Sequence, residues 1–276
     1  MTATYKIKDF DTIIKIGTTF GQNWFRGHSK IYNELTPGIY RQRYNNRFYE
    51  GFRPDVEQEF AEEFKRKAPS IVSNLPDVNN HLEWLFLMQH HGVPTRLLDW
   101  SENILVATFF AVCDDVKSDA ELWSMLPWKL NNTLGFWGLP VIDKSPELNF
   151  LASEIFHSNA EILRQDLNLK TIPNSPLAFL PPLKHPRMTS QQSAFTIHPK
   201  GENTKTIIET INDEKFLTRY IIPKGLKTRF RRKLSALGID YKNIFPDLEG
   251  LAKTIVENGK GLAWSQPDPL KLEKIE

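Results

Sequence analysis

The chain has 276 residues, of which 40% are hydrophobic and 12% aromatic, enough to bury a sizeable core in one large or two small domains. Its 35 basic and 33 acidic residues leave a formal net charge of +2, which argues against binding of nucleic acid over the whole surface. The single cysteine, Cys113, excludes an intrachain disulfide framework and a cysteine-rich zinc site. No stretch approaches the ~18 apolar residues of a membrane span, and the N-terminus lacks a signal-peptide core, so we expect a cytoplasmic protein without a membrane partner.

The first elements are a short helix over residues 8–16 and a strand over residues 23–26 that ends at Gly27. Side chains at a strand end can face a cleft, and a glycine beside Arg26 would let a ligand or a second chain approach the backbone. The alternative is that Arg26 makes a structural salt bridge and Gly27 forms a turn.

Two helices follow, over residues 55–70 and about 80–91. The charges of the first helix are expected to be a solvated face. The second helix brings His90 and His91 to a polar segment. Two adjacent histidines cannot face the same point on a helix, so we expect a hydrogen-bonding or stacking role for one of them rather than metal binding.

The densest polar chemistry lies in residues 89–101, which include a glycine and a proline that end the preceding helix. Within this segment, residues 95–100 are expected to form a short strand or tight turn. Asp99 or Ser101 should cap an apolar helix over residues 104–112. The N-terminus of that helix would favour an anion such as phosphate.

The remaining chain alternates between irregular and regular segments. Prolines crowd residues 131–186, which we interpret as an insertion or flexible lid rather than core. Strands are expected at residues 121–126, 193–198 and 216–222, and helices at residues 146–165, 204–211, 226–237 and from Pro246. The helix at 226–237 has a basic face from Lys227 to Lys233, which is either solvated or a contact for nucleic-acid phosphates.

This mixed order of elements indicates an α+β fold with a small split mixed or antiparallel sheet flanked by helices. We expect one domain over residues 1–260, with the insertion at about 131–186, and an extended C-terminal tail over residues 261–276.

Four blocks of this sequence resemble the bacterial FRG-domain family, which is named for a Phe-Arg-Gly tripeptide. They are Phe25-Arg26-Gly27-His28, residues 89–99 with 107–111, Arg187 with residues 191–195, and residues 245–252. Ser193 stands where the family pattern has glycine. The resemblance implies a bacterial toxin or anti-phage defence effector that acts on nucleic acid or protein, with an antitoxin protein as a potential partner.

The motif order is also similar to that of the ADP-ribosyltransferase fold. In that fold an arginine on the first strand holds the dinucleotide, a serine or threonine on a following strand leads into a helix, and a glutamate on a late strand completes the site. Arg26, then Thr95 or Ser101, then Gln191 or Gln192 stand in this order.

This likeness implies NAD as the substrate, with no metal. Cleavage of the nicotinamide–ribose bond passes through an oxocarbenium-like transition state, so the site must anchor the pyrophosphate, stack the nicotinamide and contact the ribose hydroxyls. The expected catalytic residues are Arg26, Thr95, Asp99 and Gln192. The expected NAD-binding residues are Phe25, Arg26, Gly27, His91, Arg96, Trp100 and Ser101.

The late strand offers only glutamine where the transferases have glutamate. A glutamine can hydrogen-bond a ribose hydroxyl but cannot neutralise positive charge, and the nearest acids by motif are Asp99, Asp247 and Glu249. Two alternatives therefore stay open. One is a non-catalytic module that holds nucleic acid or a nucleotide through Arg26, Arg96 and the basic helix; the other is a protein-interaction domain whose polar segment is structural.

Overall fold

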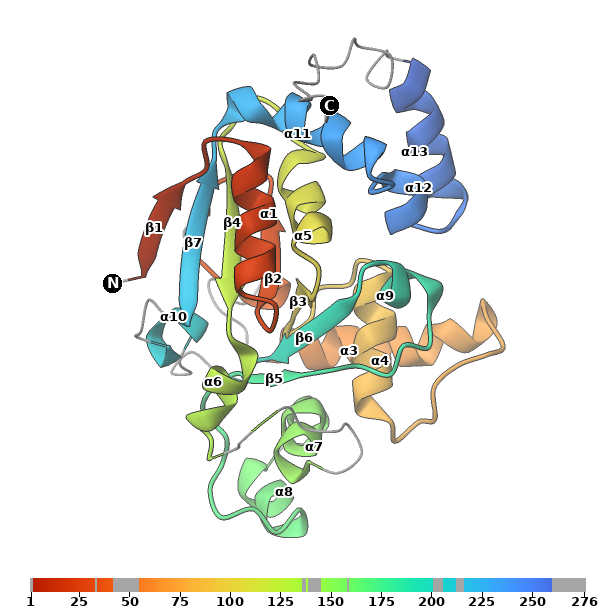
Figure 1. The fold of residues 1–276 in the computed structure, drawn as a ribbon. Helices are drawn as coiled ribbons and strands as arrows, with labels where there is room; N and C mark the ends of the chain where they lie inside the picture. The colour runs from red at the N-terminus through yellow and green to blue at the C-terminus, as the bar shows by residue number, and fades with distance from the viewer. Residues whose placement is uncertain are drawn as a thin grey trace, which may run out of the picture.

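The computed structural model describes residues 2–32, 34–41, 55–135, 138, 145–157, 159–200, 206–211 and 216–259. The fold is α+β, as predicted, and its strands form one open seven-stranded sheet in the order β1-β7-β4-β2-β3-β6-β5 (Figure 1). All neighbouring strands are antiparallel except the β1–β7 pair. The strands are β1 Ala3–Lys6, β2 Trp24–His28, β3 Leu97–Ser101, β4 Ala120–Met125, β5 Leu177–Phe179, β6 Ser193–Ile197 and β7 Leu217–Ile222.

The helices cover the sheet in two groups. Helices α1, α5 and α11 pack together on the half of the sheet that contains β2, β4 and β7, whereas α3, α4 and α7 lie by the half formed by β3, β6 and β5 (Figure 1). The helices of the first half of the chain are α1 Phe10–Thr19, α2 Gly38–Arg41, α3 Val56–Lys67, η1 Ala68–Ser70, α4 His81–His90 and α5 Ile104–Val112. Those of the second half are α6 Pro127–Asn132, α7 Pro146–Ser153, η3 Glu154–Phe156, α8 Ala160–Asp166, α9 Pro186–Ser190, α10 Ile207–Thr210, α11 Lys224–Ala236, α12 Tyr241–Ile244 and α13 Leu248–Gly259.

Helix α5 is the centre of the core. It is apolar on all faces, which is typical of a helix surrounded by other elements, and it packs against β2, α1 and α11. Its N-cap is Asn103, whose side-chain oxygen accepts from the backbone N–H of Leu105 at 2.8 Å. The prediction that Asp99 or Ser101 caps this helix was wrong, because both belong to β3 and the chain needs two more residues to leave the sheet.

Gly27 lies where β2 and α5 make their closest contact. A Cβ atom built on Gly27 would lie 1.9 Å from the carbonyl oxygen of Ala107 and 2.7 Å from the backbone nitrogen of Ala111. Gly27 therefore permits the close approach of a helix of the same chain. The sequence had instead suggested that it lets a ligand or a second chain approach.

The proline-rich region is only partly peripheral. Helices α7 and α8 form a small lobe (Figure 1), but β5 is fully buried and pairs with β6 at the edge of the sheet. Interpreting all of residues 131–186 as outside the core was thus wrong for Leu177–Phe179, because flanking prolines end a short strand without preventing it. It was also wrong for α7, whose Leu148, Phe150 and Leu151 are fully buried in the same core cluster as β5. The predicted tail over residues 261–276 lies outside the described residues. Among the helices that the structure describes, none has the length and apolar composition needed to span a bilayer.

Candidate functional site

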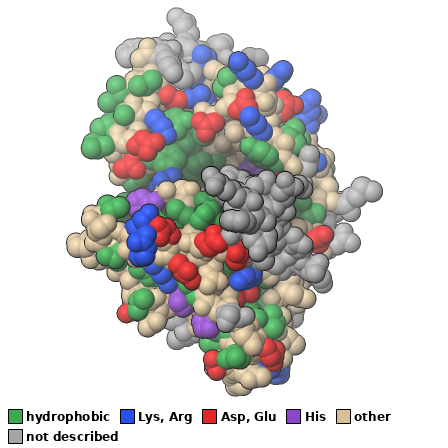
Figure 2. Space-filling view, turned by 180° about the vertical axis from the view of Figure 1, so that it is seen from behind, with side chains coloured by type: hydrophobic (Ala, Val, Ile, Leu, Met, Phe, Trp, Pro, Cys, Tyr) green, Lys and Arg blue, Asp and Glu red, His purple; other side chains and the backbone are tan. Residues whose placement is uncertain are grey.

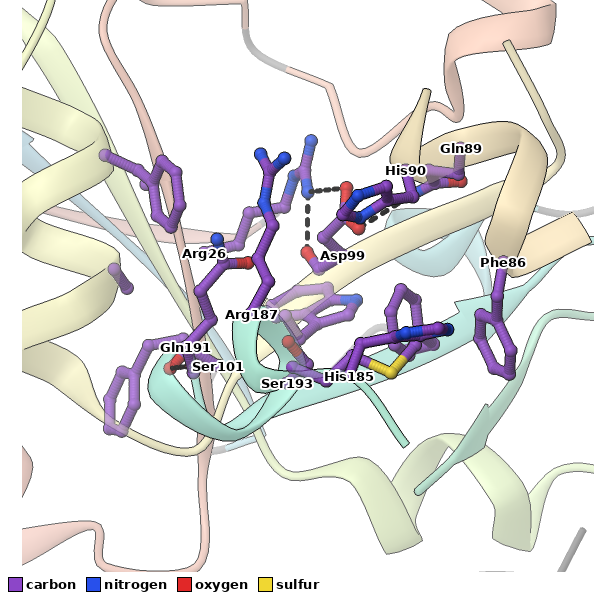
Figure 3. Close-up of a pocket in the computed structure, with 17 residues that line it drawn as sticks. Arg26, Phe86, Gln89, His90, Asp99, Ser101, His185, Arg187, Gln191 and Ser193 are labelled. Atoms are coloured by element: carbon purple, nitrogen blue, oxygen red, sulfur yellow. Dashed lines mark hydrogen bonds and ion pairs between the residues drawn. The ribbon is translucent and has the colours of Figure 1, made fainter. Parts of the chain in front are cut away.

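A pocket of about 260 Å³ lies where β2, β3 and β6 meet α4, α5 and α9 (Figure 3). Viewed from behind, the surface is hollowed, with apolar walls, between the side formed by α12 and α13 and the side formed by α3 and α4 (Figure 2). The polar side chains that line the pocket include Arg26, Gln89, His90, Asp99, Ser101, Arg187 and Gln191. The chain therefore gathers polar groups from three of its motif blocks at one point.

Arg26 enters the pocket from β2 and is held in place by the protein. Its Nε donates to Nε2 of His28 at 2.8 Å, and one terminal nitrogen donates to the backbone oxygen of Asp99 at 2.6 Å. The same nitrogen lies 3.7 Å from the Asp99 carboxylate, and the side chain is 13% exposed. Burial lowers the pKa of Arg26 to about 10, and Asp99 opposes this shift, so the guanidinium stays charged at neutral pH.

Two buried groups behind Arg26 fix its orientation. Burial, followed by the charge of Arg26, lowers the pKa of His28 to about 4, so the imidazole is neutral. Its Nε2 must then accept from Arg26, and its Nδ1–H must donate to Glu121 of β4 at 2.7 Å. Sequence reasoning assigned no role to His28 or Glu121, although a lone glutamate in an otherwise buried strand was a signal for a buried polar partner.

Asp99 and Thr95 are linked through Gln89. The Gln89 amide donates to the Asp99 carboxylate at 2.6 Å, and the hydroxyl of Thr95 donates to the Gln89 carbonyl oxygen. Asp99 and Gln89 line the pocket, whereas Thr95 is buried beside it. Thr95, expected to be catalytic, is placed where it orients Gln89 rather than where it can touch a ligand.

Gln191, rather than Gln192, reaches the pocket. The Ser101 hydroxyl donates to the backbone oxygen of Gln191 at 2.7 Å, and the Gln191 amide nitrogen donates to the Ile244 carbonyl at 3.2 Å. Gln192 is an exposed turn residue with a φ of 44°, and its backbone oxygen accepts from the N–H of Glu102 at 2.9 Å. Gln192, expected to be catalytic, does not line the pocket, because the turn before β6 directs its side chain to solvent.

Arg96 is also absent from the pocket. Its guanidinium is buried and pairs with Glu57 of α3 at 2.8 Å and with Glu154 of η3. Burial alone would lower the pKa of Arg96, but the two carboxylates raise it above its usual value. Arg96 therefore joins α3 and η3 to the sheet, and its expected role in dinucleotide binding does not fit this position.

The two histidines at the end of α4 divide between two hollows. His90 lines the polar pocket, whereas His91 lies near Phe64, with ring centroids 6.4 Å apart, in a separate apolar groove. His91 was the residue expected to bind the dinucleotide. Consecutive helical residues point about 100° apart, and the structure turns His90 toward the site.

Two cations of the basic helix α11 are engaged within the chain. The ammonium of Lys227 is buried and donates to the carbonyls of Ser29 at 2.8 Å and Asp115 at 2.6 Å. Arg231 pairs with Glu257 of α13. The interpretation of residues 227–233 as a nucleic-acid contact was wrong for these two cations, because both serve the packing of the chain itself.

Three other expected residues do line the pocket, namely Phe25, Gly27 and Trp100. Phe25 and Trp100 are almost fully buried, and the Trp100 indole N–H donates to Thr196 at 3.2 Å, so each offers the pocket only part of its ring. No three His, Cys, Asp or Glu side chains among the described residues are grouped so as to hold a metal ion.

Fold and site together define an α+β protein with a small polar pocket at the ends of its central strands. Residues 21–120 match the model of the FRG domain, so this part of the chain is an FRG domain. No curated protein and no solved structure matches the chain. The matched segment includes the Arg26 and Asp99 blocks, whereas the blocks around Gln191 and Phe245 lie outside it.

Proposed function

We propose that the pocket binds NAD and that the protein transfers ADP-ribose from it to a nucleic acid or a protein. The observation that supports this most is the convergence of Arg26 on β2, Ser101 at the end of β3 and Gln191 just before β6. These are the three strand positions that carry the site in ADP-ribosyltransferases. Here the three strands are also direct neighbours in the sheet.

The lining suggests how the dinucleotide is held. Arg26 keeps the N–H groups of Nη2 for a phosphate, because its bonds to His28 and Asp99 use Nε and Nη1. The Gln191 amide nitrogen is held by a backbone carbonyl, which leaves its oxygen to accept from a ribose hydroxyl. Phe110, which is more exposed than Phe25, is the better ring for stacking on nicotinamide.

Among the described residues that line the pocket, Asp99 is the one with a carboxylate. We therefore assign it the role of stabilising the positive charge that develops during cleavage. Its side chain is 60% exposed, and Gln89 fixes the direction of its carboxylate. As the bond between ribose C1′ and nicotinamide breaks, the bonding electrons leave with nicotinamide and positive charge develops on the ribose. A carboxylate near that charge lowers the barrier, and the acceptor nucleophile then forms the new bond to C1′.

The direct test is to incubate the purified protein with NAD labelled in its adenylate part and bacterial extract, and to measure nicotinamide release and transfer of the label. Asp99→Asn should lower turnover by about 100-fold or more while NAD affinity changes little, because it removes charge and keeps shape. Gln192→Ala is the matched control, since that side chain lies outside the pocket. The proposal is refuted if the folded wild-type protein releases no nicotinamide, or if both variants lose activity equally.

A non-catalytic nucleotide-binding module is the second candidate. It is favoured by the lack of a glutamate before β6 and by the position of the Asp99 carboxylate 3.7 Å from Arg26, where it can act as a structural counter-ion. Binding of ADP-ribose in calorimetry without any nicotinamide release would support this candidate over the transferase. Expression in bacterial cells tests the toxin and defence roles suggested by the family, with growth arrest as the expected result.

A further inference from the structure

Arg187 is a second arginine of the pocket, and it enters from α9, opposite the strand that carries Arg26 (Figure 3). Its side chain makes no hydrogen bond or ion pair with any of the residues that the structure describes. Its recorded contact is with an aromatic ring: the guanidinium carbon lies 4.4 Å from the centre of the Phe245 ring. The charge of Arg187 is thus positioned by the protein but not neutralised by it.

Phe245 is a rigid platform for this guanidinium. Its ring packs against Phe110 at 5.9 Å and stacks on Tyr241 at 6.1 Å. The backbone oxygen of the preceding residue, Ile244, accepts from the Ser190 hydroxyl at 3.1 Å, which ties α12 to α9. A guanidinium that rests on a fixed ring loses less freedom on binding an anion than a freely moving one does.

Two histidines lie beside Arg187 in the pocket. His90 and His185 line the same pocket and lie close together, with ring centroids 6.0 Å apart. Burial, followed by the charge of Arg187, lowers the pKa of His90, which favours the neutral imidazole. Asp247 acts in the opposite direction on His90, but it makes no ion pair with Arg187.

Arg26 and Arg187 therefore provide two guanidinium groups that the protein holds by different contacts. Arg26 uses Nε and Nη1 to bind its own sheet and retains Nη2, whereas Arg187 is stacked on one face and retains its N–H groups. Guanidinium groups bind phosphate oxygens through paired N–H donors, and two of them suit a diphosphate better than a single phosphate.

We propose that Arg187 is a ligand-binding residue that holds the diphosphate of a nucleotide together with Arg26, and that Phe245 is the positioning residue for it. The proposal rests on the nucleotide pocket of the proposed function, and it does not depend on bond cleavage. The diphosphate lies between the two arginines, which leaves Asp99 and Gln191 for the ribose.

Calorimetry with ADP, ADP-ribose, inorganic pyrophosphate and nicotinamide tests this proposal. Arg187→Gln should weaken binding of the three diphosphate ligands by about 10-fold or more and leave nicotinamide binding unchanged, since one charged hydrogen-bonding group is lost. Arg232→Gln is the matched control, because it makes the same change at an exposed arginine of α11 outside the pocket. Phe245→Leu keeps the charge, and we expect a smaller loss of about threefold from it.

The outcomes separate the two proposals. Equal affinities for the Arg187→Gln and Arg232→Gln variants overturn the role of Arg187 and leave the transferase proposal standing. Diphosphate binding that depends on Arg187 without nicotinamide release supports the role of Arg187 and refutes the transferase. Absence of any diphosphate binding by the folded wild-type protein overturns both. Thermal unfolding of each variant verifies folding, and Arg187→Lys, which retains charge but not the planar group, should have an intermediate affinity.

Discussion

The most direct test of the packing concerns Gly27→Ala. The new methyl carbon would lie 1.9 Å from the Ala107 carbonyl oxygen, whereas real Cβ contacts essentially never fall below 3.0 Å. Strand β2 and helix α5 must therefore separate by about 1 Å, in the part of the core where α5 is buried on every side. Overpacking of a core typically costs about 1–3 kcal/mol, and since the clash here is with backbone, we expect a loss of about 3 kcal/mol or more.

Urea denaturation followed by circular dichroism measures this loss, with Gly21→Ala as the matched control because a Cβ atom there has nothing within 4 Å. The control should differ from wild type by less than about 1 kcal/mol. Adding Ala107→Gly should not rescue Gly27→Ala, because the obstructing atom is the carbonyl oxygen that both residues at position 107 possess. A stable Gly27→Ala variant, or rescue by Ala107→Gly, would refute the reasoning.

Three further predictions concern buried polar groups, each measured as the free energy of unfolding. Arg96→Met should cost about 3–5 kcal/mol, because it leaves the carboxylates of Glu57 and Glu154 buried without their cation; a change below 1 kcal/mol would contradict the paired arrangement. Lys227→Met should cost about 2 kcal/mol or more, since three backbone carbonyls lose their donor, and should leave any nucleic-acid affinity unchanged. Stability should fall as the pH drops from 6.5 towards 4, because His28 has a pKa near 4 when folded and 6.5 when unfolded, so the unfolded chain binds its proton first; His28→Gln should make this decline shallower, and an unchanged slope would count against it.

The main features of the fold followed from periodicity and turn residues. The apolar helix over residues 104–112 and the strands near 121–126, 193–198 and 216–222 appear within one or two residues of their predicted bounds. Strand β5 was missed, because three apolar residues between prolines carry too short a pattern to distinguish a strand from a loop.

Within the site, the sequence could not distinguish residues of the same type when their roles depend on distant partners or on backbone conformation. Arg26 and Arg96 are both strand-adjacent arginines in the sequence, and what distinguishes them is a pair of carboxylates, Glu57 and Glu154, that are 39 and 58 residues from Arg96 along the chain. Similarly, the choice between Gln191 and Gln192 depends on a left-handed turn residue that only the backbone conformation shows. Local sequence located the segments of the site but not the direction of each side chain.

The sheet order bears on how this chain can be synthesised and divided. The family segment over residues 21–120 contains only β2 and β3 in full, and these are central strands that share a single registered pair, Phe25 with Ser101. Their main hydrogen-bonding partners are β4 and β6, and β6 begins more than 70 residues after the segment ends. A fragment trimmed to residues 21–120 would carry two unpaired strand edges and should aggregate. During synthesis on the ribosome, β3 likewise cannot pair fully until β6 has been made. We therefore expect the family segment to be the centre of a larger cooperative unit, and not a domain that can be excised or transplanted.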